Sequence, residues 1–265
     1  MNTRMTLRPC LTQKTRGLTL MELVVVMAIL AALAGIVVPL LPNLITRAHT
    51  SSQATNVAEL AKAIQMYQAV HLGYPNDFDS PVDGSGNLLS IVVGATGTDY
   101  TPVTLTDTNG VGTLDALASS GITAVETLQA SGSGDWDPTF FPYGNDQTVT
   151  PIPSVLASGT KLAGLTGAAA SREFGVSAAA QYVILGVGRF TTMQGNTLQE
   201  APVHFDDDPN GAPNVAYARL AAVFQVTSDD GAAPLAKAAL VGIGAFHASG
   251  LAGLNSHLKE YYGAK

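Results

Sequence analysis

The apolar positions of this 265-residue chain fall into one uninterrupted run and several shorter, periodic segments. The run Leu23–Thr46 contains no charged residue. A helix over this run would measure about 36 Å at a rise of about 1.5 Å per residue, which exceeds the roughly 30 Å hydrocarbon core of a bilayer. Further along, Val57, Leu60 and Ile64 recur at helical spacing among polar residues. The pattern therefore predicts a membrane-spanning helix followed by an amphipathic helix over about Leu44–Leu72.

The segments that follow are shorter and richer in loops. Gln181–Val187 is a β-branched, mostly apolar run beside glycines and is the strongest predicted strand. Asp77–Asn87 is rich in Asp, Pro, Gly and Ser, so it predicts a loop. The other predicted strands are Leu88–Val93, Tyr100–Leu105, Val203–Phe205 and Ala218–Val226, and the predicted helices are Leu114–Ala130, broken near Gly121, and Leu251–Tyr262. An antiparallel sheet packed on the long helix is the simplest assembly, which is an α+β fold.

Composition and charge narrow the class of protein. Twenty acidic and 13 basic residues give a formal net charge of −7, which argues against a nucleic-acid surface. Cys10 is the only cysteine, so the chain can form neither an intrachain disulfide nor a multi-cysteine zinc site. The sequence contains no nucleophile elbow, no HExxH and no phosphate-binding loop. We therefore predict a protein that is not an enzyme and does not bind nucleic acid.

The residues before the apolar run are basic and include no acid as far as residue 16. Basic segments tend to stay in the cytoplasm, so everything after residue 47 is expected to lie outside it. Glu22 stands at the start of the run, and a carboxylate at the bilayer centre costs about 2.5–3.5 kcal/mol on insertion scales. Two ordinary interpretations are a secretory signal cut after Ala32–Ala34 and a plain signal anchor. The first is opposed by the apolar residues that continue after Gly35.

The stretch Arg16–Leu23, with the sequence RGLTLMEL, resembles the processing site of the type IV pilin and type II secretion pseudopilin superfamily. The resemblance implies that a prepilin peptidase cuts after Gly17 and methylates Leu18, the first mature residue. Glu22 then becomes the fifth mature residue, and Pro39 falls at the twenty-second, where the family favours proline. The apolar helix is accordingly expected to belong to the mature protein.

The resemblance also implies roles and partners for these residues. Cleavage exposes an α-amine on Leu18, whose pKa is near 8 in water. Glu22 is expected to pair with this amine on a neighbouring subunit, since a buried carboxylate is tolerated when it is paired. Pro39 removes a backbone donor and is expected to loosen the helix. The expected partners are copies of the chain, other pilins or pseudopilins, the prepilin peptidase and methyltransferase, the inner-membrane assembly platform and the membrane.

The same resemblance predicts the domain organisation and location. It divides the chain into a cleaved basic leader at 1–17, a transmembrane and filament-core helix at 18–42, an amphipathic helix at 43–75 and an α+β head at 76–265. The protein is expected to be single-pass in the cytoplasmic (inner) membrane, with a cytoplasmic N-terminus and a periplasmic or extracellular head, and to enter a filament after assembly. Gly73, expected to stop the helix, and Tyr74-Pro75 look like the helix-to-loop junction of the major pseudopilin of type II secretion. The head is longer than that of a typical major pseudopilin, so it is expected to contain insertions.

Major pseudopilins of type II secretion stabilise a loop with calcium, so acidic turns are candidate calcium sites. Two sets of residues qualify, namely Asp206, Asp208 and Asn210, and Asp107, Asn109 and Asp115. The first set begins like an EF-hand loop, but the twelfth position is Tyr217 in place of a bidentate Glu, so an EF-hand is excluded. A solvated acidic turn is the simpler interpretation of each set, and no cofactor is required.

Three functions remain open on the sequence. The resemblance favours a structural filament subunit, either a pseudopilin of a type II secretion-like system or a type IV pilin-like protein. The alternative is a monomeric, membrane-anchored, extracytoplasmic binding domain that only looks like a prepilin. A third hypothesis is a secreted enzyme released by signal peptidase. The position of the mature N-terminus separates the three.

Overall fold

The computed structural model describes residues 19–38, 41–82, 99–127, 152–202, 220–247 and 250–263. The chain divides into two compact units, Met1–Ile45 and Thr46–Lys265. The predicted leader, Pro39 and the predicted strands Leu88–Val93 and Val203–Phe205 lie outside the described residues.

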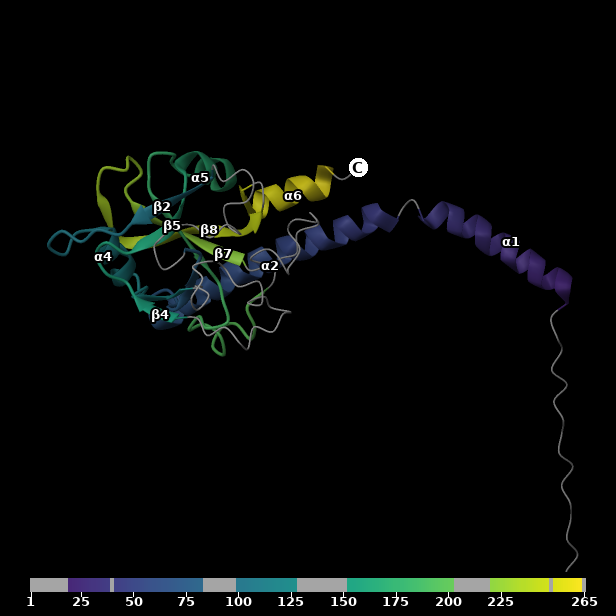
Figure 1. Cartoon of the computed structure of the whole chain (residues 1–265), viewed down its shortest axis with the longest axis horizontal. Coiled ribbons are helices and arrows are strands. Elements are labelled where there is room, and N and C mark those ends of the chain that lie inside the picture. Colours follow the sequence, from purple (N-terminus) through teal and green to yellow (C-terminus); the bar gives the residue numbers. More distant parts are fainter. Residues whose placement is uncertain are drawn as a thin grey trace, which may run out of the picture. The chain divides into compact units, whose positions relative to one another are not determined.

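The first unit contains an apolar helix, α1 (Leu20–Val37), drawn in purple in Figure 1. Its 18 residues would span about 27 Å at a rise of about 1.5 Å per residue. Every residue of α1 is exposed. Within the described residues, α1 is the helix whose length and composition suit a membrane span. The predicted N-terminal apolar helix is therefore confirmed.

The second helix, α2 (Leu41–His71), runs without interruption for 31 residues. Its buried positions include Val57, Leu60 and Ile64, the apolar stripe that the sequence predicted. These three side chains belong to the larger of two hydrophobic clusters in the head. Most of the stability of such a helix comes from burying its apolar face against other elements. The amphipathic pattern therefore identified the correct face.

The end of α2 differs from the prediction that Gly73 stops the helix. Leu72 takes the left-handed conformation, with φ of +59°, that usually falls to glycine at a helix C-terminus. Gly73 serves another purpose, because a Cβ there would lie 3.3 Å from the carbonyl oxygen of Ser120. That carbonyl accepts a hydrogen bond from Tyr74 N at 2.6 Å. A larger residue would therefore require the two backbone segments to shift slightly apart, and glycine avoids this shift.

The strands of the described residues form one mixed sheet. They are β1 (Phe78–Ser80), β2 (Tyr100–Thr104), β3 (Ala124–Thr127), β4 (Ile152–Val155), β5 (Lys161–Leu165), β6 (Tyr182–Gly186), β7 (Leu220–Thr227), β8 (Pro234–His247) and β9 (Gly250–Gly253). The order is β4-β3-β1-β6-β7-β8-β9, and β5 pairs with both β2 and β6. β1 and β3 are parallel, whereas the other named pairs are antiparallel. The α+β fold is confirmed, and its largely antiparallel sheet contains this parallel pair.

Several elements differ from the local prediction. The predicted helix Leu114–Ala130 is helical only at its start, as α4 (Thr113–Ser119), and then becomes β3. β1 lies within the predicted loop after α2. The C-terminal helix begins at α6 (Leu254–Gly263), because the residues before it pair with β8 as β9. In each case pairing with a neighbouring strand outweighs the weak local pattern. The helix α5 (Gly167–Phe174) was not predicted.

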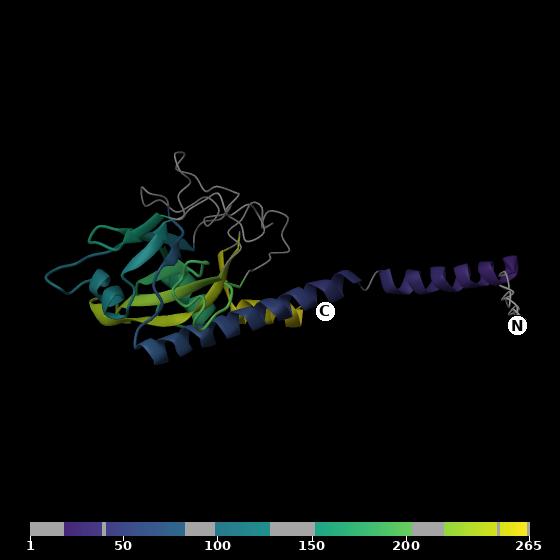
Figure 2. The same cartoon turned by 90° about the horizontal axis from the view of Figure 1, so that it is seen from below.

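Helices cover both faces of the sheet (Figures 1 and 2). Leu60 of α2, Leu117 of α4 and Leu185 of β6 belong to one buried cluster. Ala169 of α5 and Ile184 of β6 belong to the other. Successive residues of a strand point to opposite faces, so β6 contributes to both clusters and is buried along its whole length. A strand that is covered on both faces consists of a continuous apolar run, which explains why β6 could be predicted from the sequence.

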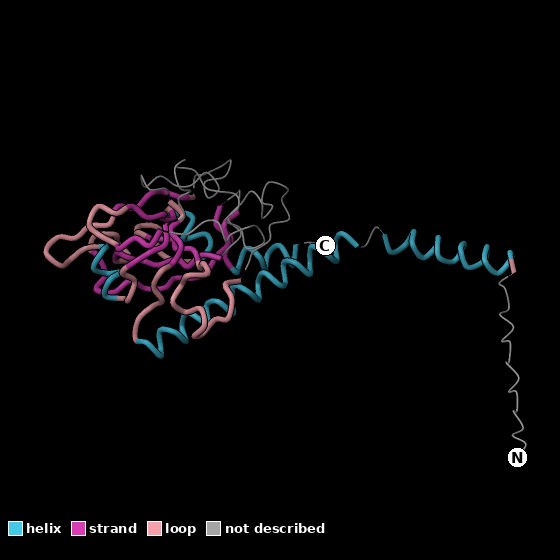
Figure 3. Tube along the Cα trace, turned by 60° about the horizontal axis from the view of Figure 1, so that its bottom comes forward, coloured by secondary structure: helices cyan, strands magenta, loops and turns pink. Residues whose placement is uncertain are grey.

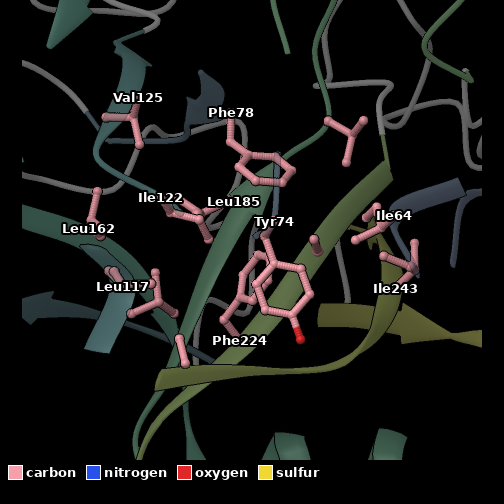
Figure 4. Close-up of a cluster of buried hydrophobic side chains, with 14 of the residues drawn as sticks. Ile64, Tyr74, Phe78, Leu117, Ile122, Val125, Leu162, Leu185, Phe224 and Ile243 are labelled. Atoms are coloured by element: carbon pink, nitrogen blue, oxygen red, sulfur yellow. The ribbon is translucent and has the colours of Figure 1, made fainter. Parts of the chain in front are cut away.

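Aromatic side chains of the loop after α2 pack into the larger hydrophobic cluster, as Figure 4 shows. The rings of Tyr74 and Phe78 lie edge-on to that of Phe224, at centroid distances of 5.1 and 5.7 Å. The Tyr74 hydroxyl also accepts a hydrogen bond from Leu240 N at 3.1 Å. The junction between the long helix and the sheet is therefore part of the core.

Candidate functional site

The candidate site is the N-terminal end of α1, where Thr19 and Glu22 form a capping box. The Glu22 carboxylate Oε2 accepts hydrogen bonds from Thr19 N and from Thr19 Oγ1, both at 2.9 Å. In return, Glu22 N donates to Thr19 Oγ1 at 3.3 Å. This reciprocal arrangement satisfies backbone donors that a helix N-terminus leaves free, and a carboxylate there also suits the helix dipole. The structure thus gives the acidic residue of the apolar segment a local partner.

The helix that follows presents apolar side chains all around its surface. Leu20 and Met21 are 81% and 78% exposed, and the remaining large residues of α1 are about half exposed or more. A helix that is apolar on all sides is expected inside a membrane or among other helices. Glu22 is the only charged residue of α1. The structure therefore places one carboxylate at the N-terminal end of a helix whose exposed surface is otherwise apolar.

The other predicted processing and assembly residues are not part of this geometry. Gly17, Leu18 and Pro39 lie outside the described residues. Their predicted roles therefore stay predictions, as does the pairing of Glu22 with a neighbouring amine. The contribution of Thr19 was not predicted, although the spacing of Thr19 and Glu22 before an apolar run is a sequence signal for a capping box.

Comparison with known proteins gives one match for this segment. Residues 12–38 match the family model of the prokaryotic N-terminal methylation motif. Comparison with curated proteins and comparison with solved structures find no match. Together with α1, the motif supports a membrane-anchored, type IV pilin-like or pseudopilin protein that is processed by a prepilin peptidase. Proteins of this kind are structural subunits and not enzymes.

The predicted calcium residues are only partly described. Asp206, Asp208 and Asn210 lie outside the described residues. In the second set, Asp107 Oδ1 accepts a hydrogen bond from Gly110 N at 2.9 Å, and Asn109 adopts a φ of +58° in the same turn. Asp115 lies in the first turn of α4. The described residues contain no group of three His, Cys, Asp or Glu side chains that could hold a metal ion, and calcium stays a prediction.

A charged cluster that the sequence did not indicate links Asp99, directly before β2, with α5, β9 and α6. Arg172 Nη2 and Nη1 donate to the two carboxylate oxygens of Asp99 at 2.6 and 3.3 Å. Arg172 Nε donates to Glu173 Oε1 at 2.8 Å. Glu173 Oε2 accepts from Gly253 N at 3.2 Å and from the Ser256 hydroxyl. No sequence signal could have found this cluster, because Asp99 and Arg172 are 73 residues apart.

The hydrogen bonds of this cluster decide the charge state of Glu173. Burial disfavours its ionised form, but hydrogen bonds from Ser256, Arg172 and Gly253 outweigh burial, so the pKa of Glu173 lies below its ordinary value. Hydrogen bonds to Asp99 and Glu173 raise the pKa of Arg172. Because the pKa of Glu173 is depressed on folding, its carboxylate stabilises the folded head near neutral pH. That contribution is lost as the pH falls through the folded-state pKa.

Replacing Glu173 by Gln is expected to lower the free energy of unfolding by about 1–3 kcal/mol near neutral pH, because buried donors lose a charged acceptor. The difference between the variant and the unchanged chain should shrink as the pH falls, since the unchanged chain then protonates Glu173. Thermal unfolding from about pH 7 to about pH 3 measures this difference. A difference that is the same across this pH range would contradict the assigned role.

The contribution of Glu126 to the stability of the head has the opposite pH dependence to that of Glu173. The stability profile of the Glu173→Gln variant is therefore needed to separate the two contributions. Burial, followed by the negative charges of Asp77 and Asp79, raises the pKa of Glu126. A carboxyl with a raised folded-state pKa stabilises the fold at low pH, and this contribution is lost as the pH rises through that pKa. The pH profile of a single chain adds both effects. Subtracting the profile of the Glu173 variant isolates Glu173.

Proposed function

We propose that this chain is a structural filament subunit that is cut after Gly17 and assembles through α1. It would be a pseudopilin of a type II secretion-like system or a type IV pilin-like protein. The observation that carries the proposal is the position of Glu22, directly inside the methylation motif and at the capped start of a fully exposed apolar helix. An apolar surface as extensive as that of α1 is stable when it is covered by lipid or by other helices. In the core of a filament, other helices cover it.

The proposed assembly step exchanges the partners of Glu22. In the single chain, Thr19 supplies both hydrogen bonds to the carboxylate. When α1 leaves the lipid and packs among other helices, a carboxylate with only neutral donors becomes unfavourable, whereas a cationic amine is a strong partner in a medium of low dielectric constant. Cleavage after Gly17 creates that amine on Leu18. Processing therefore provides the group on which assembly depends.

The finer assignment to a major pseudopilin of type II secretion rests on the junction after α2. Tyr74 and the residues around it resemble that family, and the ring of Tyr74 packs on Phe224 in the core. Such packing supports a structural role for the junction. The inner-membrane assembly platform and the other pilins or pseudopilins are the proposed partners.

The test is the N-terminus of the protein extracted from membranes. We expect the mature chain to begin at N-methylated Leu18, and mass spectrometry of the N-terminal peptide measures this directly. Gly17→Val is the matched variant, and it should leave the leader attached because the residue before the cut is no longer glycine. A chain that still begins at Met1 would indicate the monomeric anchored domain. A chain that begins at Gly35 would indicate a secreted protein.

A further inference from the structure

The loop between β2 and α4 contains a tight two-residue turn that is exposed to solvent. Thr108 N donates to Val111 O and Val111 N donates to Thr108 O, both at 3.3 Å, so Asn109 and Gly110 are the central residues. Their φ angles are +58° and +77°. Positive φ at both central positions is typical of a type I′ turn, which strongly prefers Asn-Gly. Figures 1, 2 and 3 agree that this loop projects from the head.

The dipeptide that suits this turn is also chemically labile. The backbone nitrogen of Gly110, once it has lost its proton to a base in solution, can attack the side-chain carbon Cγ of Asn109. The new bond between nitrogen and Cγ expels the amide nitrogen, which takes a proton from water and leaves as ammonia, and a cyclic succinimide remains. Water then opens the succinimide to aspartate, or to isoaspartate when it adds at the main-chain carbonyl. Glycine favours the attack because it has no side chain to hinder it.

A hydrogen bond occupies the nitrogen that would have to react. Gly110 N donates to Asp107 Oδ1 at 2.9 Å. The N–H must leave this acceptor before the nitrogen can lose its proton and approach Cγ of Asn109. A carboxylate beside the nitrogen also disfavours the negative charge that deprotonation creates. Asp side chains often bond to the backbone of their own turn, and here that bond falls on the reacting atom.

The base of the loop holds the turn in this arrangement. Thr106 N donates to Thr113 Oγ1 at 3.0 Å, and Leu114 N donates to Thr106 O at 3.1 Å. A Cβ at Gly112 would lie 1.9 Å from Thr106 O, so the two sides of the loop approach each other too closely to leave room for a side chain. The tip of the loop is therefore exposed to water while the backbone on both sides of it is fixed.

We propose that Asn109 is a site of spontaneous deamidation and that Asp107 protects it by holding Gly110 N. Aspartate at position 109 would place a second negative charge in the turn beside Asp107. Isoaspartate would also lengthen the backbone between Thr108 and Val111, and it would disrupt their pair of hydrogen bonds. The inference does not depend on processing or on filament assembly, because the turn lies within the head unit.

The experiment follows Asn109 in the purified full chain in detergent. The buffer contains a metal chelator, so that no cation competes for Asp107. Chymotrypsin is used to release the peptide 106–114, which is flanked by leucines at the two cutting positions. Mass spectrometry of this peptide measures the conversion of the amide to the acid, and enzymatic methylation of isoaspartate measures the second product. The chain is incubated both folded and in denaturant.

Three variants separate the hydrogen bond from the charge. Asp107→Ala removes the acceptor of Gly110 N. Asp107→Ser supplies a hydroxyl, which bonds to the backbone of a turn more weakly than a carboxylate does. Glu200→Ala is the matched control, because it removes an exposed carboxylate outside this loop.

In the folded state we expect Asp107→Ala to deamidate at least about tenfold faster than the unchanged chain, which is the effect on a rate of losing a hydrogen bond to a charged acceptor. Asp107→Ser should fall between the two, and Glu200→Ala should match the unchanged chain. In denaturant the turn is lost, so the unchanged chain should react faster than when it is folded and at a rate similar to that of Asp107→Ala.

Equal rates for Asp107→Ala and the unchanged chain in the folded state would overturn the proposal, because the hydrogen bond would then give no protection. An equal acceleration in Glu200→Ala would also overturn it and assign the effect to net charge. The unchanged chain provides a test without any variant. If its Asn109 reacts as fast when folded as in denaturant, or stays intact in both, then the turn is not a protected deamidation site.

Discussion

Glu22→Gln chains are expected to insert into the membrane and to be cut after Gly17, yet to be at least about tenfold depleted from filaments, since truncating one member of a buried charge pair weakens association strongly. Gln is a suitable replacement because it also occurs at this position of a capping box and can still accept a hydrogen bond from Thr19. The variant therefore removes the charge and keeps the cap. The measurement is the fraction of the protein in sheared filaments relative to the membrane fraction.

A second variant separates the charge of Glu22 from its role in the cap. Thr19→Val removes the hydroxyl that accepts from Glu22 N and donates to the carboxylate, while the carboxylate itself remains. If the proposed pairing is correct, Thr19→Val retains more of the filament fraction than Glu22→Gln. Full assembly of Glu22→Gln would exclude a charge pair in the filament. Equal loss in both variants would assign the effect to helix capping.

The membrane helix and its motif could be predicted because their signals are local. A run without charge over Leu23–Thr46 needs no tertiary partner to be recognised, and the methylation motif is contained in a few adjacent residues. The predicted strands at Gln181–Val187 and Tyr100–Leu105 correspond to β6 and β2 within one residue at each end. Both strands have patterns dominated by β-branched, aromatic or apolar residues.

The longest of the described strands could not be predicted from its residue types. β8 runs for 14 residues from Pro234, but it is rich in Ala and Gly, which have low strand propensity. Gly242 leaves room for a side chain that packs on the strand, because a Cβ at this position would lie 2.6 Å from the ring of Phe174 on α5. The strand forms because β7 pairs with it along most of its length. Close packing of α5 on this face of the sheet thus requires small residues in β8, and small residues do not give a sequence pattern typical of a strand.

The parallel pair and the charged cluster were missed for a related reason. β1 is three residues long and pairs with β3 more than forty residues away, so the pattern of either strand is too short to stand out. The hydrogen-bonding groups of the charged cluster come from three separate segments of the chain, which contain Asp99, Arg172–Glu173 and Gly253–Ser256. In the candidate site, the motif predicted a role for Glu22 that stays a prediction, and the structure added Thr19 as the hydrogen-bond partner of Glu22 in the single chain.

Phe224→Ala is expected to lower the free energy of unfolding of the head by about 3–5 kcal/mol, the usual cost of emptying a buried aromatic site. Phe224 is fully buried, and its ring contacts those of Tyr74 and Phe78, so the loss would release the junction between α2 and the sheet. Folded domains are commonly stable by only about 5–15 kcal/mol, so this change removes a large part of the total. Denaturant unfolding of the detergent-solubilised chain measures it, and Val155→Ala, at an exposed strand position, should change it by less than about 0.5 kcal/mol.

The same variant tests whether the two units of the chain act separately. α1 belongs to a different compact unit from Phe224, and the methylation motif ends at residue 38. We therefore expect Phe224→Ala chains to reach the membrane and to be cut after Gly17, while their heads become sensitive to added protease. Loss of processing in this variant would mean that the peptidase depends on a folded head. Processing that persists beside a protease-sensitive head would place all of its determinants in the N-terminal segment, as the motif predicts.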